Sequence, residues 1–467
     1  MAQAILGIYG LGTMGSALAL NLAENGVLTA VANREADWVK PFLTSAGSLA
    51  PNLIGCPDLE SFVKSIATPR LVLFMIPSGA PLDGMIDQVT PLLAQGDTII
   101  DAGNADFNAT IRRAEAAKAQ GLQYVGIGVS GGEEGARHGP SMMFGGTEQS
   151  WDRLKPILSK IAASYENSPC VDRMGPDGAG HFVKTVHNGI EYADMQMLAE
   201  IYGLLRDTGG QPAAKIGATF ESWRSGPMAS FLLDVSARAL QTTDAETETP
   251  LVDVIRDRAG QKGTGRWTLI EALKLGQSAS TIEAAVAARS WSSMTEARDF
   301  GADVLNGPDH PAPLPDPATI ERAMLAGRIL SHAQGFDLMK AASDDQGWNL
   351  NPARTAEIWR AGCILRSDLL NDIALSFHET PPLDRLLFAP RMVAMLNHSV
   401  PALRATVVAG LQSGVPVPAL SGALAWYDSL RQKRGTANLI QAQRDLFGAH
   451  GFERLDKPGK HHGDWND

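Results

Sequence analysis

A glycine-rich hexapeptide near the start of the chain constrains the fold more than any other feature. Residues 10–15 read Gly10-Leu11-Gly12-Thr13-Met14-Gly15, with the spacing GxGxxG, and they directly follow an apolar stretch at residues 4–9. Residues 16–25 have a helical pattern, and residues 27–32 form a second apolar stretch. Strand, GxGxxG, helix and strand in this order are the context in which the motif binds a dinucleotide. We therefore expect a Rossmann-type domain that binds a pyrophosphate at the helix N-terminus.

The residues that follow the second apolar stretch bear on which dinucleotide binds. An Asp or Glu at this place binds the ribose 2′-hydroxyl of NAD, whereas an Arg accommodates the 2′-phosphate of NADP. The sequence here is Asn33-Arg34-Glu35. We expect NADP, with Arg34 on the phosphate. NAD remains an alternative, because the carboxylate of Glu35 repels that phosphate.

The rest of the pattern predicts an α/β domain followed by a helical one. The length of 467 residues suggests two to four domains. Residues 71–76, 98–101 and 124–129 are continuous apolar runs, which are typical of buried parallel strands. After a glycine-rich turn at residues 172–180, the apolar period becomes that of helices. We expect a doubly wound dinucleotide-binding domain at residues 1–176, a large all-helical domain at 177–435, and a C-terminal helix and tail at 436–467.

The net charge and the cysteine count exclude several classes of binding partner. The chain has 40 Lys and Arg against 51 Asp and Glu, a formal charge of −11, which argues against nucleic acid or an anionic membrane as a partner. Its three cysteines, Cys56, Cys170 and Cys363, show no CxxC spacing and cannot all pair. This favours reduced thiols over a disulfide framework or a zinc site. We expect a cytoplasmic protein that binds no metal.

Four polar residues mark the start of the helical domain. Lys184, His187, Asn188 and Glu191 are spaced i, i+3, i+4 and i+7, so they share one face of a helix. A solvated surface stripe is the alternative interpretation. It suits this segment poorly because the neighbouring positions are apolar and because Gly189 weakens the helix by about 1 kcal/mol. The pattern favours a buried catalytic face.

Longer motifs occur along nearly the whole chain: Asp101-Ala-Gly-Asn104, Gly128-Val-Ser-Gly-Gly-Glu-Glu-Gly-Ala-Arg137, the Lys184 helix, Gln261-Lys-Gly-Thr-Gly-Arg-Trp-Thr268, Arg360-Ala-Gly-Cys-Ile-Leu-Arg366 and the segment Asn438 to His450. In this order the sequence resembles the 6-phosphogluconate dehydrogenase family, in its long, dimeric form. The resemblance implies the oxidative decarboxylation of 6-phospho-D-gluconate to D-ribulose 5-phosphate and CO2 with reduction of NADP. This reaction belongs to the pentose phosphate pathway and to gluconate utilization.

The resemblance also implies a role for each matching position. Lys184 matches the family's general base and Glu191 its general acid. The positions that match substrate-binding residues are Asn104, Ser130, Gly131, Gly132, His187, Asn188, Tyr192, Lys262, Arg289, Arg444 and His450. Those that match cofactor-binding residues are Gly10, Leu11, Gly12, Thr13, Met14, Gly15, Asn33, Arg34, Glu35, Met75, Ile76, Pro77 and Asn104. Arg444 and His450 match tail residues that the family donates from the second subunit, so the helical domain and tail would form a homodimer with shared active sites.

Three departures from the family pattern bear on the cofactor site. Glu35 replaces a common Thr, Pro77-Ser78-Gly79 replaces Lys-Ala-Gly, and Ala102 replaces a Gly. Two other functions stay open at this point. A relative that oxidises another β-hydroxyacid would keep Lys184 and lack the phosphate ligands, and a non-catalytic NADP-binding sensor would have lost the acid or the base.

Overall fold

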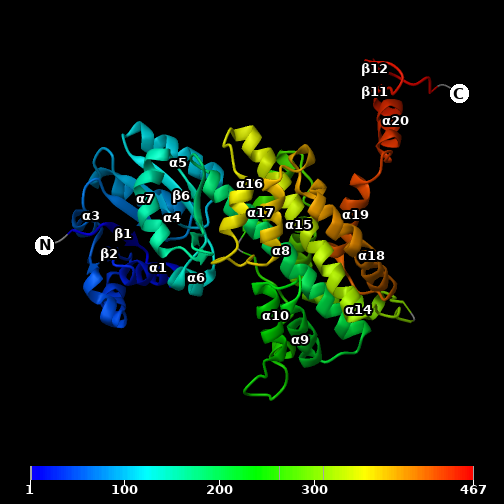
Figure 1. Cartoon of the computed structure of the whole chain (residues 1–467), viewed down its shortest axis with the longest axis horizontal. Coiled ribbons are helices and arrows are strands. Elements are labelled where there is room, and N and C mark those ends of the chain that lie inside the picture. The colour runs from blue at the N-terminus through cyan, green and yellow to red at the C-terminus, as the bar shows by residue number, and fades with distance from the viewer. Residues whose placement is uncertain (1–2, 262, 309, 466–467) are drawn as a thin grey trace.

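The computed structural model describes residues 3–261, 263–308 and 310–465 of the chain. An α/β body that contains the N-terminus lies beside a larger helical body, and the last helix extends beyond the latter (Figure 1). The predicted fold class, a Rossmann-type domain followed by a helical one, is confirmed.

The α/β body contains one eight-stranded sheet of order β10-β7-β6-β5-β4-β1-β2-β3. Six strands are parallel; β7 pairs antiparallel to β6 and parallel to β10. The strands are β1 (Leu6–Tyr9), β2 (Thr29–Ala32), β3 (Leu53–Gly55), β4 (Leu71–Phe74), β5 (Thr98–Asp101), β6 (Gln123–Val129), β7 (Met142–Gly145) and β10 (Val171–Gly175). The helices are α1 (Thr13–Glu24), α2 (Val39–Ser45), α3 (Leu59–Ser65), α4 (Ala80–Val89), α5 (Phe107–Ala119), α6 (Gly132–His138) and α7 (Glu148–Ile161).

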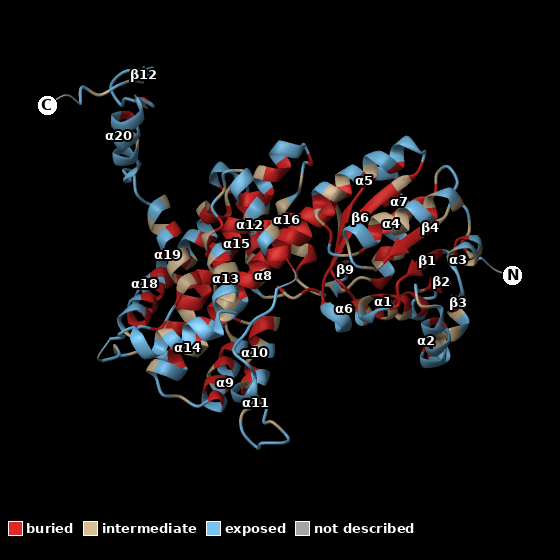
Figure 2. Ribbon diagram, turned by 180° about the vertical axis from the view of Figure 1, so that it is seen from behind, coloured by how far each residue is buried: buried red, intermediate tan, exposed pale blue. Residues whose placement is uncertain are grey.

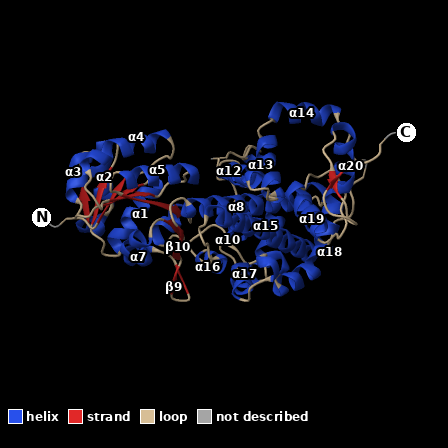
Figure 3. Ribbon diagram, turned by 90° about the horizontal axis from the view of Figure 1, so that it is seen from above, coloured by secondary structure: helices blue, strands red, loops and turns tan. Residues whose placement is uncertain are grey.

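Helices cover both faces of this sheet (Figure 3). Apolar residues of α1, α2 and α7 form one buried cluster with the sheet. Those of α3, α4 and α5 form a second cluster on the other face. The sheet therefore presents only its edges and its strand ends. The carboxyl ends of β1, β4 and β5 meet at one edge, which is where ligands bind in open α/β sheets.

Element boundaries differ from the expected ones where glycine or proline intervenes. The first helix begins at Thr13 rather than at residue 16, because Gly12 already serves as its N-cap. The strand expected at 71–76 ends at Phe74, three residues before Pro77 and the loop that leads to α4; a proline has no N–H to continue the ladder. The tail after the last helix contains a short hairpin, in which β11 (Phe452–Glu453) pairs antiparallel with β12 (Lys460–His461).

The helical body is built around two long buried helices, α8 and α15 (Figure 2). Most residues of both are buried, including a nearly continuous run of α15 from residue 323 to 339. The helices of this part are α8 (Ala179–Gly203), α9 (Ala213–Ser222), α10 (Phe231–Gln241), α11 (Leu251–Val254), α12 (Thr264–Lys274), α13 (Ser280–Ser292), α14 (Thr295–Val304), α15 (Pro317–Gln346), α16 (Pro352–Ile358), α17 (Leu369–His378), α18 (Pro390–Gln412), α19 (Pro418–Leu430) and α20 (Ala437–Gly448). Helices that are buried on nearly all sides occupy the centre of such a body.

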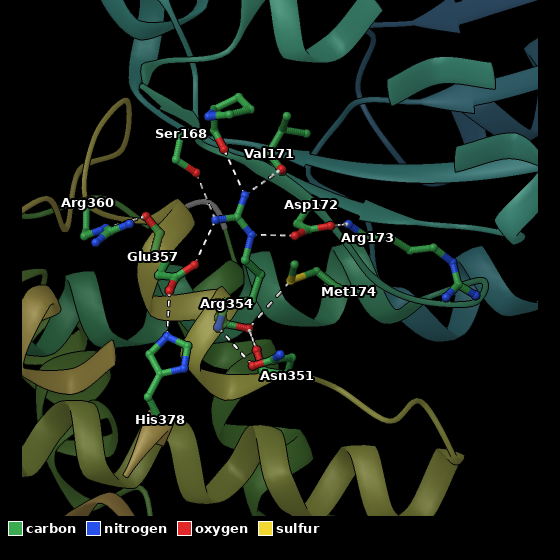
Figure 4. A network of polar contacts seen from close by, with 12 residues as sticks. Ser168, Val171, Asp172, Arg173, Met174, Asn351, Arg354, Glu357, Arg360 and His378 are labelled. Atoms are coloured by element: carbon green, nitrogen blue, oxygen red, sulfur yellow. Dashed lines mark hydrogen bonds and ion pairs between the residues drawn. The ribbon is translucent and has the colours of Figure 1, made fainter. Parts of the chain in front are cut away.

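A polar network joins the two bodies (Figure 4). The guanidinium of Arg354 on α16 donates to the carboxylate of Asp172 on β10 and, at 3.1 Å, to the backbone oxygen of Pro169, in the short strand β9 (Ser168–Pro169) that pairs with β8 (Ser164–Tyr165). It also donates at 2.9 Å to Glu357, whose other oxygen contacts His378 of α17 at 2.8 Å. A planar guanidinium with five donors can satisfy several acceptors at once. The network therefore fixes α16 against the edge of the sheet.

Candidate active site

Helix α8 lies directly against β6 because glycines separate them. A Cβ atom added to Gly128 would lie 2.3 Å from the Cβ of Lys184, closer than any real packing contact. Glycine at this position therefore lets the helix approach the strand, and the side chain of Lys184 reaches the residues that follow β6. Ser130 is the first of them, and both side chains are buried.

A chain of hydrogen bonds connects the polar face of α8 to Ser130. The Nζ atom of Lys184 donates to Ser130 Oγ at 3.1 Å, and this hydroxyl lies 3.4 Å from His187 Nε2. His187 Nδ1 lies 3.2 Å from the Oδ1 atom of Asn188 and 3.5 Å from Lys184 Nζ. A neutral His187 protonated on Nδ1 satisfies the contacts with Ser130 and Asn188. The predicted polar face is thus a connected buried network rather than a solvated stripe.

The electrostatics of this network favour uncharged side chains. Burial lowers the pKa of Lys184, although the charge of Glu191 opposes the shift. Burial, and secondarily the charge of Lys184, lowers the pKa of His187 well below its usual value. Burial disfavours the charged form of each base because the low-dielectric interior solvates charge poorly. Burial is thus the main reason that the pKa of Lys184 lies below that of an exposed lysine.

Glu191 lies at the other end of the same face. Its side chain is 21% exposed and one carboxylate oxygen is 3.7 Å from His187 Nδ1. Burial raises the pKa of Glu191, and the charges of Lys184 and Arg289 partly oppose this shift. A buried amine with a lowered pKa and a carboxyl group with a raised pKa on one helix face have the environments that an acid–base pair needs near neutral pH.

Arg289 lies over the ring of Tyr192, the residue that follows Glu191 on α8. The guanidinium of Arg289, on α13, lies 3.4 Å from the centre of the Tyr192 ring. It also donates at 3.2 Å to the backbone oxygen of Gly260. Lys262, predicted as a further ligand of the same anion, lies outside the described residues. The arrangement gives a phosphate a charged donor next to a phenol hydroxyl.

The glycine-rich turn has the geometry expected of a pyrophosphate site. Gly10 has φ = 109°, a conformation that favours glycine, and a Cβ on Gly15 would lie 1.8 Å from the backbone oxygen of Gly10. A Cβ on Gly12 would meet no atom within 4 Å, so the space above this residue is open to a ligand. The first turn of α1 contains no acidic side chain, so its N–H groups can donate hydrogen bonds to a bound anion. Leu11, Thr13 and Met14 complete this turn.

The other predicted positions follow the ends of neighbouring strands. Asn33 to Glu35 follow β2, Met75 to Pro77 follow β4, and Asn104 follows β5 and is exposed. Gly131, with φ = 105°, and Gly132 follow β6 and begin α6. Because the carboxyl ends of parallel strands meet at one edge, these residues lie at the same edge of the sheet.

Two predicted ligands are not brought to this site within the chain. Arg444 lies on α20 and His450 directly follows that helix. Figure 1 and Figure 2 show α20 beyond α19, at the end of the molecule opposite the sheet. Both residues are exposed, and Arg444 donates to Gln441 of its own helix at 2.9 Å.

Three residues that the sequence interpretation missed surround the network. The ring of Trp359 lies edge-on to His187, with centroids 5.2 Å apart. Cys363 is fully buried; burial raises the pKa of its thiol, and the charge of Lys184 partly opposes this shift. Thr268 on α12 donates to the backbone oxygen of Thr185 at 2.7 Å. The motif at residues 360–366, which contains Cys363, could have pointed to this region. The motif alone does not show which catalytic side chain its residues pack against.

The described residues contain no group of three or more His, Cys, Asp or Glu placed to hold a metal ion. In the same part of the chain, none of the helices combines the length and the apolar character that crossing a bilayer requires.

Comparison with known proteins gives a consistent result. Residues 5–175 match the family described as the NAD binding domain of 6-phosphogluconate dehydrogenase, and residues 180–465 match 6-phosphogluconate dehydrogenase, C-terminal domain. The decarboxylating 6-phosphogluconate dehydrogenase of Escherichia coli K12 is 43% identical over 472 residues, with 100% of both chains covered. The NAD(+)-dependent enzyme of Bacillus subtilis 168 is 42% identical over 468 residues, with 99% of both covered.

A solved structure agrees with these matches. The 6-phosphogluconate dehydrogenase of Plasmodium falciparum, described in its apo form and in complex with NADP+ and with 6-phosphogluconate, superimposes with a TM-score of 0.95 at 34% identity. The comparison covers 98% of this chain and 100% of that one. The chain therefore belongs to the 6-phosphogluconate dehydrogenase family.

Proposed function

We infer that the chain is an NADP-dependent, decarboxylating 6-phosphogluconate dehydrogenase of the pentose phosphate pathway. The observation that carries this inference is the buried Lys184, hydrogen-bonded to Ser130 at 3.1 Å, on the same helix face as Glu191. Family membership supplies the substrate class, because the substrate named for the Plasmodium falciparum structure is 6-phosphogluconate. The reaction converts it with NADP+ to D-ribulose 5-phosphate, CO2 and NADPH.

The glycine-rich turn and the loops after β2, β4 and β5 would bind NADP. The open space above Gly12 and the uncapped N-terminus of α1 suit its pyrophosphate. When bound, the nicotinamide supplies the two-electron acceptor of the oxidation. Asn104 and residues 75–77 would hold the nicotinamide, and residues 33–35 would contact the adenosine ribose.

Lys184 acts as the general base. Its lowered pKa increases the neutral fraction that can remove the proton of the substrate's C3 hydroxyl as this carbon is oxidised. The resulting ammonium then donates a hydrogen bond to the new C3 carbonyl. The bond between C1 and C2 breaks, CO2 leaves, and the electron pair moves toward that carbonyl oxygen. The adjacent ammonium stabilises the negative charge that develops there.

Glu191 acts as the general acid after CO2 has left. The five-carbon enediol needs a proton on its new C1 to become the ketone. The raised pKa of Glu191 keeps a larger fraction of this carboxyl group protonated than an exposed glutamate would have at the same pH. The position seven residues from Lys184 places the acid two helical turns away on the same face.

The remaining residues orient the substrate. His187, Asn188, Asn104 and the segment Ser130 to Gly132 contact its hydroxyl and carboxylate groups. Tyr192, Lys262 and Arg289 bind the 6-phosphate from one subunit. A dianion next to a guanidinium gains charge-assisted and partly bidentate hydrogen bonds.

The site is completed by a second copy of the chain. Helix α20 exposes an apolar stripe of Leu439, Ile440, Leu446 and Phe447, which an isolated chain would leave in water. Asp445 fixes the hairpin to this helix, because its carboxylate accepts from the N–H groups of Gly451 and Gly463, from the Trp465 indole and from His462. The preformed tail would carry Arg444 and His450 into the partner's substrate site, as a homodimer in the cytoplasm.

The reaction is tested by supplying the purified chain with 6-phosphogluconate and NADP+. NADPH absorbance, trapped CO2 and ribulose 5-phosphate should appear in equal amounts. A parallel assay with 3-hydroxyisobutyrate, a β-hydroxyacid without a phosphate, should give no turnover. NADPH formation without CO2 would contradict the decarboxylating assignment.

A further inference from the structure

The turn after β2 contains Glu35, whose carboxylate accepts hydrogen bonds from Arg34. Arg34 is the residue expected to bind the 2′-phosphate. Glu35 Oε1 accepts from Arg34 Nε at 2.7 Å and also from the terminal nitrogen Nη2 of the same guanidinium. Glu35 Oε2 accepts from Asn33 Nδ2 at 3.0 Å. Both oxygens of the carboxylate therefore have donors within the three-residue turn.

This turn is tied to the glycine-rich loop. The backbone N–H of Leu11 donates to Asn33 Oδ1 at 2.8 Å, so one amide group of Asn33 bridges the loop and the Glu35 carboxylate. In a Rossmann domain the end of β2 faces the adenosine ribose. The carboxylate is consequently fixed beside the position of the ribose 2′ substituent.

The carboxylate is charged near neutral pH. The hydrogen bond from Arg34 is the main reason that the pKa of Glu35 is below its ordinary value. Its charge also contributes, after burial, to the raised pKa of Tyr9, at the end of the neighbouring strand β1. The charge of Arg34 partly opposes this shift of the Tyr9 pKa.

Such a charge affects the two dinucleotides in opposite ways. A 2′-phosphate carries a charge of about −1.5 to −2 near neutral pH, so it has to compete with Glu35 for Arg34 and is repelled by the carboxylate. A 2′-hydroxyl has a proton that it can donate to the same carboxylate. The side chain of Arg34 is 84% exposed, so it can move between Glu35 and a phosphate without disturbing the core.

The overall sequence identity to known relatives does not indicate whether NAD+ or NADP+ is the preferred cofactor. The NAD(+)-dependent and the NADP(+)-dependent enzymes of Bacillus subtilis 168 are each 42% identical to this chain over nearly their whole lengths. The preference therefore depends on the local geometry of the turn at residues 33–35. We propose that Glu35 sets the cofactor selectivity by competing with the 2′-phosphate for Arg34, so that the enzyme uses NAD+ as well as NADP+.

This proposal rests on the proposed function, and one set of variants tests it. The full-length chain, Glu35→Gln, Arg34→Ala and Asp37→Asn are assayed with 6-phosphogluconate and either nucleotide. Glu35→Gln keeps the size of the side chain and removes its charge. Asp37→Asn is the matched control, since this exposed carboxylate lies two residues further on and has no part in the Arg34 contact.

The wild-type chain should reduce both nucleotides. In Glu35→Gln the ratio of kcat/KM for NADP+ to that for NAD+ should rise about tenfold or more, equivalent to about 1.4 kcal/mol. Arg34→Ala should lower this ratio, and Asp37→Asn should leave it within about twofold of the wild-type value, as expected for a more distant, screened charge. An unchanged ratio in Glu35→Gln, or no turnover of NAD+ by the wild-type chain, would overturn the proposal.

Failure of the proposed function would have a different signature. If neither nucleotide were reduced, titration of NADP+ and NAD+ against the same variants would still measure the selectivity through the ratio of their dissociation constants. A ratio that shifts toward NADP+ in Glu35→Gln would support the role of Glu35 in that case. A constant ratio would refute it.

Discussion

Lys184 is set apart from an ordinary lysine by its surroundings. It is almost completely buried, its pKa is lowered, and its nitrogen donates to Ser130. Lys184→Arg keeps the positive charge and cannot provide a neutral base, and Lys184→Ala removes the amine. We expect kcat to fall by about a thousandfold in both variants, with NADP+ affinity unchanged in a fluorescence titration. Rapid NADPH formation by Lys184→Arg would rule out proton removal by this side chain.

The pH profile of kcat/KM reports the acid–base pair. Activity needs a neutral Lys184, which is lost at low pH, and a protonated Glu191, which is lost at high pH. Because burial lowers the lysine pKa and raises the glutamate pKa, the two groups share one proton around the optimum, and the profile is bell-shaped. In Glu191→Gln the residual activity should keep its acidic limb and lose its alkaline decline. An alkaline decline that persists in this variant would point to another group.

For individual residues, the sequence allowed the polar face of α8 to be predicted, but not the side chains that contact this face. Lys184, His187, Asn188 and Glu191 are local neighbours, so helical periodicity alone places them together. Ser130 is 54 residues away from Lys184, and their contact depends on how α8 packs against β6. Trp359 and Cys363 act through packing and leave no periodic signal. Their proximity to His187 and Lys184 is a property of the tertiary structure.

At the scale of the elements, Gly189 lowers the helix propensity of α8 but allows α12 to pack closely against it. A Cβ added to Gly189 would lie 2.7 Å from the Cγ2 atom of Thr268, on α12. Gly189→Ala should therefore displace α12 and destabilise the protein by about 1–3 kcal/mol, and it should raise KM for 6-phosphogluconate, because α12 directly follows the Lys262 segment. The measurements are denaturant unfolding and steady-state kinetics.

The same helix offers a matched control for this prediction. Gly203, the last residue of α8, has no atom within 4 Å of an added Cβ. Gly203→Ala should thus leave KM unchanged and stabilise the protein by up to about 1 kcal/mol, the difference in helix propensity. Equal effects of the two substitutions would mean that the contact between α8 and α12 does not limit either property.

Element boundaries were predictable only where local chemistry defines them. The strand at 98–101 was predicted with its observed bounds, since a short apolar run ends there at a buried aspartate. Strand β7, residues 142–145, was missed, because its apolar run is short and its antiparallel pairing with β6 depends on α6 reversing the chain between them. Short strands of this kind are defined by pairing partners rather than by their own sequence.

For the molecule as a whole, the proposed dimer accounts for the distance of Arg444 and His450 from the other predicted site residues. Arg444 belongs to α20, which Figure 1 shows at the far end of the molecule from the sheet and which has an exposed apolar stripe. In a symmetric dimer each tail would reach the other subunit. The body of an Arg444→Ala chain and the tail of a Lys184→Ala chain then form one intact site, whereas either variant alone forms none.

Co-expression of these two variants with different affinity tags isolates the mixed dimer. Random assembly makes half of the dimers mixed, each with one intact site, so the unfractionated mixture should regain about a quarter of wild-type activity and the purified mixed dimer about half. Each homodimer should bind NADP+ normally, which controls for misfolding. If Arg444 bound substrate within its own chain, both subunits of the mixed dimer would remain defective, and an inactive mixed dimer would exclude the exchange of tails.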